Sequence, residues 1–437
     1  MKQLRIENFG PIKNVCIDIS DFSVFIGPQA SGKSTIAKAI YFFMSLKEDL
    51  LKYIYNCIEA DGLVSDLEEN LKLIIRQKFV GFWGDIRQVE SFLLFFSYEK
   101  DREIVLSSQN GYVTAAFSQL FIKDLSVIFD NYRYVLEMQE LTESTNNLLR
   151  ETKKRAFYKE VENKIVTLFA EDKVAIYIPV GRSLLATLSD SLQHLIIGKS
   201  SDANTLLDYP LKEFIEKIAN LKTVYTKSLE EIIEDKEKLS LTNIKLDKES
   251  LSEAQAIIAR ILKGEYRYGK DGEKLYIADN DSHVKLSFAS SGQQESIWIL
   301  LLLFNLILNN TKSLIIIEEP EAHLYPVAQK EIVRLISLVA GLNNNQVIIT
   351  THSPYIVTSV NNLVYAEQIG RNNKEEVSKI VPPSVWITED RLAAYFVEKG
   401  EIRTIIDEEL KLIKAEEIDH VSEIINQEFE GLFALDR

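Results

Sequence analysis

The sequence contains a short glycine-bearing loop, GPQASGKS at residues 27–34, that matches the phosphate-binding pattern G-x-x-x-x-G-K-[ST]. It follows the apolar run FSVFI, which is typical of a strand. Apolar residues at helical spacing come after it, at Ile36, Ile40, Tyr41 and Met44. The glycines let backbone N–H groups curl around a phosphate, and the start of a helix adds a favourable dipole. Strand, loop and helix in this order predict a phosphate-binding site.

The residues of this loop are expected to divide the binding of Mg-ATP between them. Lys33 would neutralise β- and γ-phosphate oxygens, Ser34 would ligate Mg²⁺, and Thr35 would reach the α-phosphate. The residues that we assign to nucleotide binding here are Gly27, Gln29, Ala30, Ser31, Gly32, Lys33, Ser34 and Thr35.

A second apolar run, LIIIEEPE at residues 314–321, ends in carboxylates. A phosphate loop requires such a carboxylate at the end of a neighbouring strand to complete its metal site. Glu318 would hold Mg²⁺, directly or through a water, although aspartate is commoner at this position. Glu319, just beyond the strand, would polarise the attacking water.

His352 directly follows a third apolar run, QVIITT. A lone histidine is usually structural, but the carboxyl edge of a parallel sheet is where ligands bind. We therefore expect His352 to contact the γ-phosphate or the attacking water. The alternation of strand, helix (327–340) and strand predicts an α/β fold with a parallel core sheet.

Four motifs together, GPQASGKST, ASSGQQ, IIIEEPEAHLYP and TTHSPY, resemble in type and order those of ABC-type ATPase heads. The resemblance is to the SMC/RecF-like branch, and in particular to OLD-like (AAA15-type) ATPases, in which EEPEAHLxP and THSP are typical. It covers residues 1–45 and about 264–365. It implies an α/β P-loop NTPase head with a mixed core sheet, an N-terminal antiparallel β lobe and an inserted helical arm.

In such heads two subunits pack head to tail, and each signature motif touches the ATP held by the other. The resemblance therefore implies that Ser290, Ser291 and Gly292 bind ATP in trans, from the start of a helix predicted at 293–310. It also implies a homodimer or higher homo-oligomer, with Glu321 to His323 along the interface. OLD nucleases carry an additional Toprim domain, but no Asp-x-Asp pair follows His352. The chain therefore resembles the ATPase without the nuclease.

The sequence pattern divides the chain into four segments. They are 1–117 (phosphate loop and β lobe), 118–263 (a largely helical insertion or arm), 264–365 (signature, acidic strand and His352) and 366–437 (a helical extension). Arg182, after the predicted strand at 174–179, has two open interpretations. It contacts the nucleotide or the interface, or it forms an ordinary salt bridge.

Composition bears on partners and location. The net charge of −15 gives no bulk attraction to nucleic acid, so DNA or RNA binding is possible but not indicated. Cys16 and Cys57 form no C-x-x-C pair, which fits a reducing cytoplasm. The apolar run 297–308 is too short to span a bilayer, so we expect a buried helix and no membrane association.

By resemblance, stand-alone heads of this kind occur in bacterial anti-phage systems, where a neighbouring gene supplies a nuclease or toxin. We therefore expect an ATP-hydrolysing switch that controls such an effector. The alternative is a RecF/SMC-like ATPase of DNA repair or chromosome maintenance that binds DNA. A scaffold that binds ATP without hydrolysing it is disfavoured by Glu319.

Overall fold

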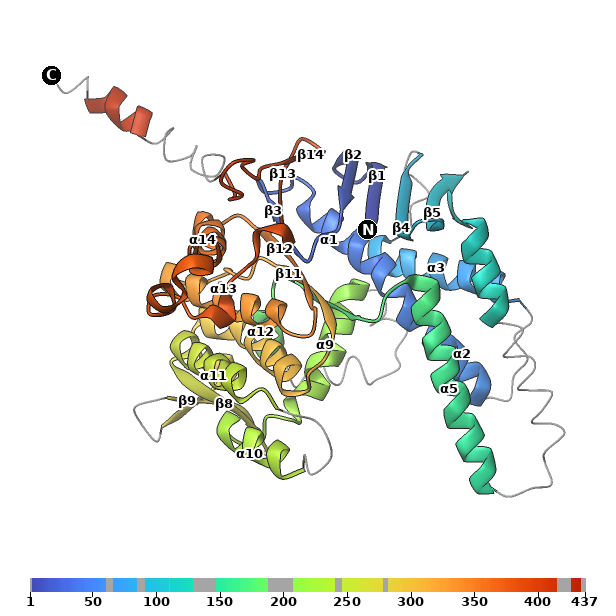
Figure 1. Ribbon diagram of the computed structural model, residues 1–437, viewed down its shortest axis with the longest axis horizontal. Coiled ribbons are helices and arrows are strands. Elements are labelled where there is room, and N and C mark those ends of the chain that lie inside the picture. The colour runs from blue at the N-terminus through green and yellow to red at the C-terminus, as the bar shows by residue number, and fades with distance from the viewer. Residues whose placement is uncertain are drawn as a thin grey trace. The chain divides into compact units, whose positions relative to one another are not determined.

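The computed structural model describes residues 2–59, 66–84, 91–109, 111–128, 147–187, 207–239, 246–277, 282–414 and 426–433. The chain forms two compact units (Figure 1). Unit 1 comprises Met1–Ile19, Thr35–Ala175 and Lys399–Ile402, and unit 2 comprises Ser20–Ser34, Ile176–Glu398 and Arg403–Arg437. This division differs from the four consecutive segments expected from the sequence, because each unit is assembled from separate stretches of the chain. For example, strands next to each other in the sequence near the N-terminus belong to different sheets.

Unit 1 contains an antiparallel sheet with the strand order β2-β1-β4-β5-β6. Its strands are β1 (Gln3–Phe9), β2 (Ile12–Asp18), β4 (Leu93–Glu99), β5 (Arg102–Gln109) and β6 (Tyr112–Phe117). Along β4 every second side chain is buried, namely Leu94, Phe96 and Tyr98, as expected of a sheet covered on one face. The N-terminal antiparallel β lobe is thereby confirmed.

The helices of unit 1 pack through aromatic side chains. They are α1 (Lys33–Met44, in unit 1 from Thr35 on), α2 (Leu46–Glu59), α3 (Leu67–Trp83), residues 119–128 and α5 (Asn147–Phe169). Phe42 on α1 meets Phe82 and Trp83 on α3 with ring centroids 5.3 and 5.2 Å apart. Such pairs stabilise the packing beyond the area that they bury.

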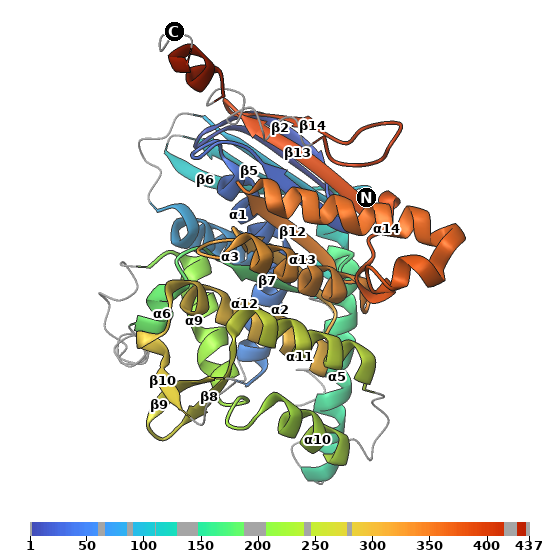
Figure 2. The same ribbon diagram turned by 90° about the vertical axis from the view of Figure 1, so that its left-hand side faces the viewer.

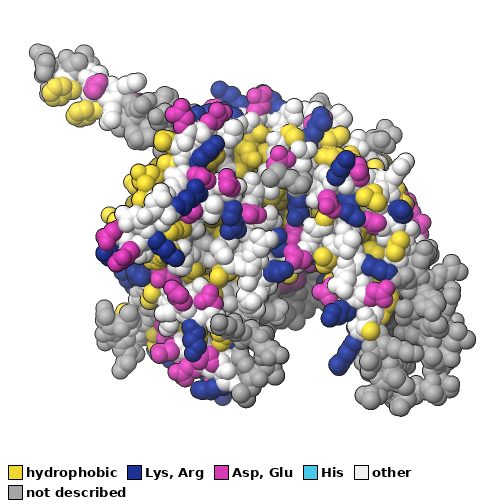
Figure 3. All heavy atoms as spheres, viewed as in Figure 1, with side chains coloured by type: hydrophobic (Ala, Val, Ile, Leu, Met, Phe, Trp, Pro, Cys, Tyr) yellow, Lys and Arg dark blue, Asp and Glu magenta, His cyan; other side chains and the backbone are white. Residues whose placement is uncertain are grey.

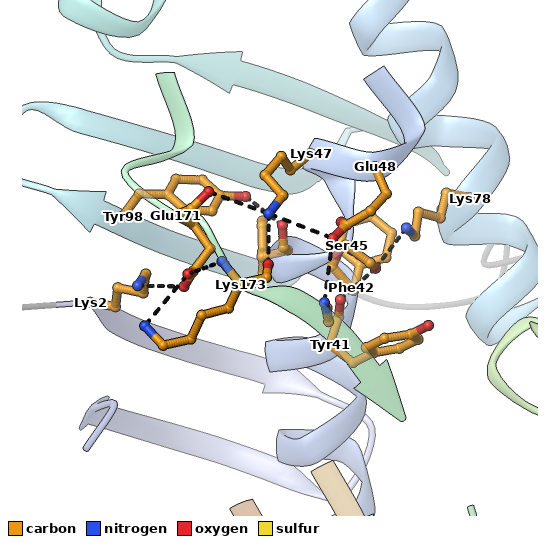
Figure 4. Close-up of polar contacts among 12 residues, drawn as sticks. Lys2, Tyr41, Phe42, Ser45, Lys47, Glu48, Lys78, Tyr98, Glu171 and Lys173 are labelled. Atoms are coloured by element: carbon orange, nitrogen blue, oxygen red, sulfur yellow. Dashed lines mark hydrogen bonds and ion pairs between the residues drawn. The ribbon is translucent and has the colours of Figure 1, made fainter. Parts of the chain in front are cut away.

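Buried polar contacts fix the far end of α1 (Figure 4). The Ser45 hydroxyl donates to the Tyr41 carbonyl in the last turn of α1 at 2.6 Å. The Tyr98 hydroxyl donates to the Phe43 carbonyl at 2.6 Å. Because the last carbonyls of a helix have no partner within it, such donors are needed where the helix end is buried. The helix that follows the phosphate loop is thus anchored at its C-terminal end.

Unit 2 is built on a six-stranded sheet with the order β14-β13-β3-β12-β11-β7. The strands are β3 (Phe22–Ile26), β7 (Val174–Ile178), β11 (Ser313–Glu318), β12 (Gln346–Thr351), β13 (Leu392–Glu398) and β14 (Glu401–Thr404). Strands β13, β3, β12 and β11 are parallel, and every residue of β3, β11 and β12 is buried. Only two residues separate β13 from β14, as in an antiparallel hairpin. The α/β fold and its mixed core sheet are confirmed.

Three helices of unit 2 stack side by side, namely α11 (Lys248–Leu262), α12 (Ser291–Leu308) and α13 (Pro326–Gly341) (Figures 1 and 2). By length and composition α12 could cross a membrane, but 72% of it is buried inside the protein. The expectation of a buried helix in this stretch is therefore confirmed.

The remaining elements of unit 2 surround this stack. They are α6 (Ser183–Thr187), α9 (Tyr209–Lys222), α10 (Leu229–Leu239), α14 (Pro354–Ser378) and a separate antiparallel sheet of β8 (Gly264–Gly269), β9 (Gly272–Ile277) and β10 (His283–Lys285). Phe214 and Ile218 on α9 and Ile257 on α11 belong to the same hydrophobic core as α12. Helices α9 and α11, which lie in the expected arm, therefore pack into the core of unit 2.

The C-terminal region differs from the helical extension expected at residues 366–437. Between Lys379 and Lys414 it contains β13, β14 and a turn closed by the Ile406–Ile413 bridge, so the prediction of helix there was wrong. Within IIDEELKLI, the Asp407 side chain accepts from the N–H groups of Glu409 and Leu410, both at 2.9 Å. Aspartate favours such local turns over helix, which explains the outcome. Helix is found at 426–433.

Candidate active site

The phosphate loop connects β3 to α1, as the sequence predicted, through several residues with positive φ. These are Gly27 (151°), Ala30 (58°) and Gly32 (109°). A Cβ atom at Gly27 would lie 2.1 Å from the Val397 carbonyl oxygen, so only glycine fits beside β13. Residues 28–30, which include Gln29, are exposed, Ser31, Gly32 and Lys33 are buried, and Ser34 is exposed. Thr35 is half-buried and begins the part of α1 in unit 1.

Lys33 points back into this loop. Its Nζ donates to the carbonyls of Gly27 and Pro28, both at 2.8 Å, and lies 3.4 Å from His352 Nδ1. Burial lowers the pKa of Lys33 to about 8, although the glutamates at 318, 319 and 321 favour its charged form. The ammonium group is thus placed where loop carbonyls, or the oxygens of a bound phosphate, can accept its protons.

Glu318 is the last residue of β11, and its side chain is almost completely buried. Its Oε1 atom has no hydrogen-bond partner within the part of the chain that the structure describes. A buried carboxylate oxygen without a partner is costly, so this atom suits a cation. No group of three His, Cys, Asp or Glu residues surrounds a potential metal position among the described residues. Mg²⁺ is usually held by one or two protein groups and substrate phosphates, so the Glu318 carboxylate is suited to be one of them.

Glu319 and His352 form the polar pair at the carboxyl edge of the sheet. Glu319 Oε1 lies 3.1 Å from His352 Nε2. This hydrogen bond is the main cause that lowers the pKa of the Glu319 carboxyl, against its partial burial. Glu319 adopts a left-handed conformation (φ 42°), and its N–H donates to the Thr350 carbonyl at 2.9 Å. Strained backbone of this kind gathers at functional sites, and here it carries the carboxylate away from the strand.

A third carboxylate, Glu321, positions His352. Its Oε1 atom accepts from the Thr351 hydroxyl at 2.6 Å and from the His352 N–H at 2.9 Å. Burial raises the pKa of the Glu321 carboxyl above its usual range. Its carboxylate bonds within its own chain, and its expected position along a subunit interface stays a prediction. Only its position two residues after Glu319 could have drawn attention to it.

Arg182 lies behind the two carboxylates of the acidic strand and is fully buried. Its guanidinium donates to the backbone carbonyls of Glu318 at 2.8 Å and Glu319 at 3.0 Å. It also pairs with Glu295 on α12, with Nη2 and Oε1 3.3 Å apart. Of the two open interpretations, the structure supports the salt bridge. The hydrogen bonds from Arg182 to the Glu318 and Glu319 carbonyls also hold the C-terminal end of β11 in place.

The signature residues begin α12. Ser290 is the N-cap, and Gln293 Oε1 accepts from its N–H at 3.0 Å, which completes a capping box. Ser290 and Ser291 are exposed. A Cβ atom at Gly292 would lie 2.7 Å from the His323 carbonyl oxygen, so glycine lets α12 approach the turn after Glu321. The structure thus brings the signature beside His323 of the same chain, and binding in trans stays a prediction.

Comparison with known families gives one match. A family model described as "AAA ATPase domain" matches residues 1–357, which include the phosphate loop, the signature, the acidic strand and His352. None of the curated proteins matches the sequence.

Several solved structures are weakly similar to this chain. An SmcHead bound to the C-winged helix domain of ScpA is 12% identical, with 92% of this chain and 96% of that chain covered and a TM-score of 0.41. The SMC head domain from Thermotoga maritima is 12% identical, with 92% and 97% covered and a TM-score of 0.34. An Smc head domain with an extended coiled coil, bound to the C-terminal domain of ScpA from Pyrococcus furiosus, is 13% identical, with 98% and 100% covered and a TM-score of 0.39. These similarities are too weak to support a conclusion about this chain.

Proposed function

The chain belongs to the AAA ATPase domain family, and we propose that it binds Mg-ATP and hydrolyses the terminal phosphate bond. One observation supports this most directly. The His352 ring lies 3.1 Å from Glu319 and 3.4 Å from Lys33, so a candidate base and a phosphate-binding cation meet at one point. That point lies at the carboxyl edge of parallel strands, where such sheets bind ligands.

The residues of the site suit distinct roles in this reaction. Lys33 and the loop N–H groups would bind the phosphates. Ser34 and the unpaired oxygen of Glu318 would hold Mg²⁺, which when bound offsets the negative charge of the phosphate oxygens. Glu319, whose lowered pKa keeps it ionised at neutral pH, would accept a proton from the attacking water. His352 would orient that carboxylate through its hydrogen bond.

We further propose that ATP joins two copies head to tail, with Ser290, Ser291 and Gly292 of each copy contacting the nucleotide of the other. Two observations support this. Ser290 and Ser291 are exposed at the N-terminal end of α12, where a helix favours anions. Two large apolar side chains close to these motifs in the sequence, Phe288 and Tyr325, are 81% and 77% exposed. Hydrolysis would remove the contact that favours the closed dimer.

The experiment compares wild type with Lys33→Ala by sedimentation velocity, without nucleotide, with Mg-ADP and with Mg-ATP, alongside phosphate release. We expect an ATP-dependent dimer and hydrolysis in wild type, and neither in Lys33→Ala. A protein that stays monomeric with ATP and hydrolyses it at full speed would contradict the proposed dimer. Unchanged ATP affinity in Lys33→Ala would contradict the site.

The resemblance to OLD-like ATPases supports a more specific role, a cytoplasmic switch in anti-phage defence that controls a separate nuclease or toxin. Figure 3 shows basic and acidic described side chains interspersed over the face drawn, and the net charge of −15 gives no bulk attraction to DNA. The test is co-expression of the neighbouring gene product with wild type or Lys33→Ala, scored by viability with and without phage. Strongly salt-dependent binding to duplex DNA would favour the repair alternative.

A further inference from the structure

An open groove of about 380 Å³ lies between α13 and α14, away from the site described above. Helix α14 is interrupted at Asn373 (φ −142°, ψ 50°), and residues from both sides of this kink, such as Leu363 and Val377, line the groove. Lys330 and Arg334 on α13 also line it, so that it is apolar with basic residues on one wall.

Large apolar side chains in this groove are exposed. The exposed fractions are 76% for Ile380, 54% for Tyr365 and 42% for Ile369. Lys330 is exposed as well, and no ion pair joins it to another residue in the described parts of the chain. A contiguous apolar surface beside a free positive charge is typical of an interaction site for an acidic amphipathic segment.

The chain itself contains such a segment, the helix at residues 426–433, with the sequence NQEFEGLF. Phe429, Leu432 and Phe433 follow the i, i+3, i+4 spacing of one helix face, and they are 66%, 68% and 55% exposed. Glu428 and Glu430 flank this face. A helix shorter than about 12 residues is only marginally stable in water without tertiary packing. This helix therefore requires a surface that covers its apolar face.

The position where the chain leaves the body favours its own groove as that surface. The Asn361 side chain on α14 bonds both the carbonyl and the N–H of Ile413, each at 2.8 Å. Eleven residues, 415 to 425, then lead to the helix. Eleven extended residues span up to about 36 Å, whereas α14 from Ser359 to Ile369 is about 15 Å long. Such a tether gives the helix an effective concentration in the millimolar range.

We propose that helix 426–433 docks in the α13–α14 groove of its own chain. Phe429, Leu432 and Phe433 contribute the apolar contact, and the flanking glutamates face Lys330 and Arg334. The docked helix covers an apolar surface that other proteins could otherwise bind. This inference does not depend on the proposed ATPase activity, because none of these residues belongs to that site.

Disulfide trapping tests the docking. In a Cys16→Ser, Cys57→Ser background, Ile380→Cys is combined with Leu432→Cys and oxidised at low protein concentration. The matched control combines Leu432→Cys with Val327→Cys, which is 65% exposed on α13 but outside the groove. We expect an intramolecular disulfide that forms about tenfold or more faster than in the control. Equal rates, or disulfides only between copies, would overturn the proposal.

Charge reversal and hydrogen exchange supply independent readouts. Lys330→Glu slows trapping about two- to fivefold, and Glu428→Lys in the same chain restores it. Backbone amides at 426–433 exchange slowly in wild type and faster in Phe429→Ser, which leaves the groove and its fold untouched. Exchange at unprotected rates in wild type, or a charge reversal without rescue, would contradict the docked helix.

Discussion

His352 Nε2 lies 3.1 Å from Glu319 Oε1, and Nδ1 of the same ring lies 3.4 Å from Lys33 Nζ. An ammonium group can only donate, so Nδ1 accepts and Nε2 carries the proton that bonds the carboxylate. The neutral ring with hydrogen on Nε2 satisfies both contacts. Glu321 supports this arrangement, because its Oε1 atom accepts a hydrogen bond from the His352 backbone N–H at 2.9 Å. One imidazole thus orients the candidate base relative to the phosphate-binding lysine.

Glu319→Gln is expected to slow ATP turnover by roughly 10²–10⁴, the range for loss of general-base assistance. Glutamine keeps the size of the side chain but cannot take up the proton of the attacking water. Binding of ATP should persist, so the variant accumulates the nucleotide-bound dimer. Single-turnover phosphate release and nucleotide titration separate the two effects.

Glu321→Gln is the matched control for that substitution. An amide oxygen at this position can still accept from Thr351 and from the His352 N–H, so turnover should fall much less than in Glu319→Gln. If turnover in Glu319→Gln remains near the wild-type value, another residue is the base.

The affinity for ATP should depend on pH through Lys33, whose pKa is lowered to about 8 in the free protein. The phosphates bind the protonated amine more tightly, so its pKa is higher in the complex than in the free protein. Below pH 8 the proton is already present, and above it binding must take a proton up. We therefore expect the Kd for ATP to rise about tenfold from pH 7 to pH 9. Calorimetry in buffers of different ionisation enthalpy measures the proton uptake.

Lys33→Arg is the control for this pH dependence. Its guanidinium keeps the positive charge throughout this range, so its Kd should stay flat from pH 7 to pH 9 even if it is weaker overall. A flat profile in wild type as well would show that Lys33 is charged in the free protein.

The sequence predicted the elements whose signal is local. The phosphate loop, the strand that ends at Glu318 and the strand before His352 are each recognisable from fewer than ten residues. Contacts between distant segments left no such signal. Arg182 and Glu295 are 113 residues apart in the chain, and Leu392 on β13 pairs with Phe22 on β3, 370 residues earlier. Both contacts form only once the sheet and the helices around it are assembled. The spacing of residues along the sequence does not reveal how they assemble.

Arg182→Ala is expected to destabilise unit 2 by about 3–5 kcal/mol, because it leaves the Glu295 carboxylate buried without its partner. The thermal midpoint should fall by about 10 °C. The substitution also frees the carbonyls of Glu318 and Glu319, so turnover should fall at temperatures where the variant is still folded. Differential scanning calorimetry and turnover at low temperature measure the two effects.

Arg371→Ala provides the comparison for Arg182→Ala. Arg371 pairs with Glu367 and Glu389 on the surface, where solvent screens the charges, so the thermal midpoint should hardly change. Equal midpoints for Arg182→Ala and wild type would show that the buried Arg182 contacts contribute nothing to the fold.

Mixing two inactive variants tests whether the signature acts in trans. Lys33→Ala removes the phosphate-binding lysine, and Ser290→Arg places a bulky side chain at the exposed start of α12. In a mixed dimer shared head to tail, one site carries both defects and the other carries neither, so mixing should restore at most one competent site per dimer. Ser290→Asn preserves the helix cap and serves as the control for effects on α12 itself. If the signature acts only within its own chain, the mixture remains inactive. Full activity of Ser290→Arg alone would show that the signature takes no part in the reaction.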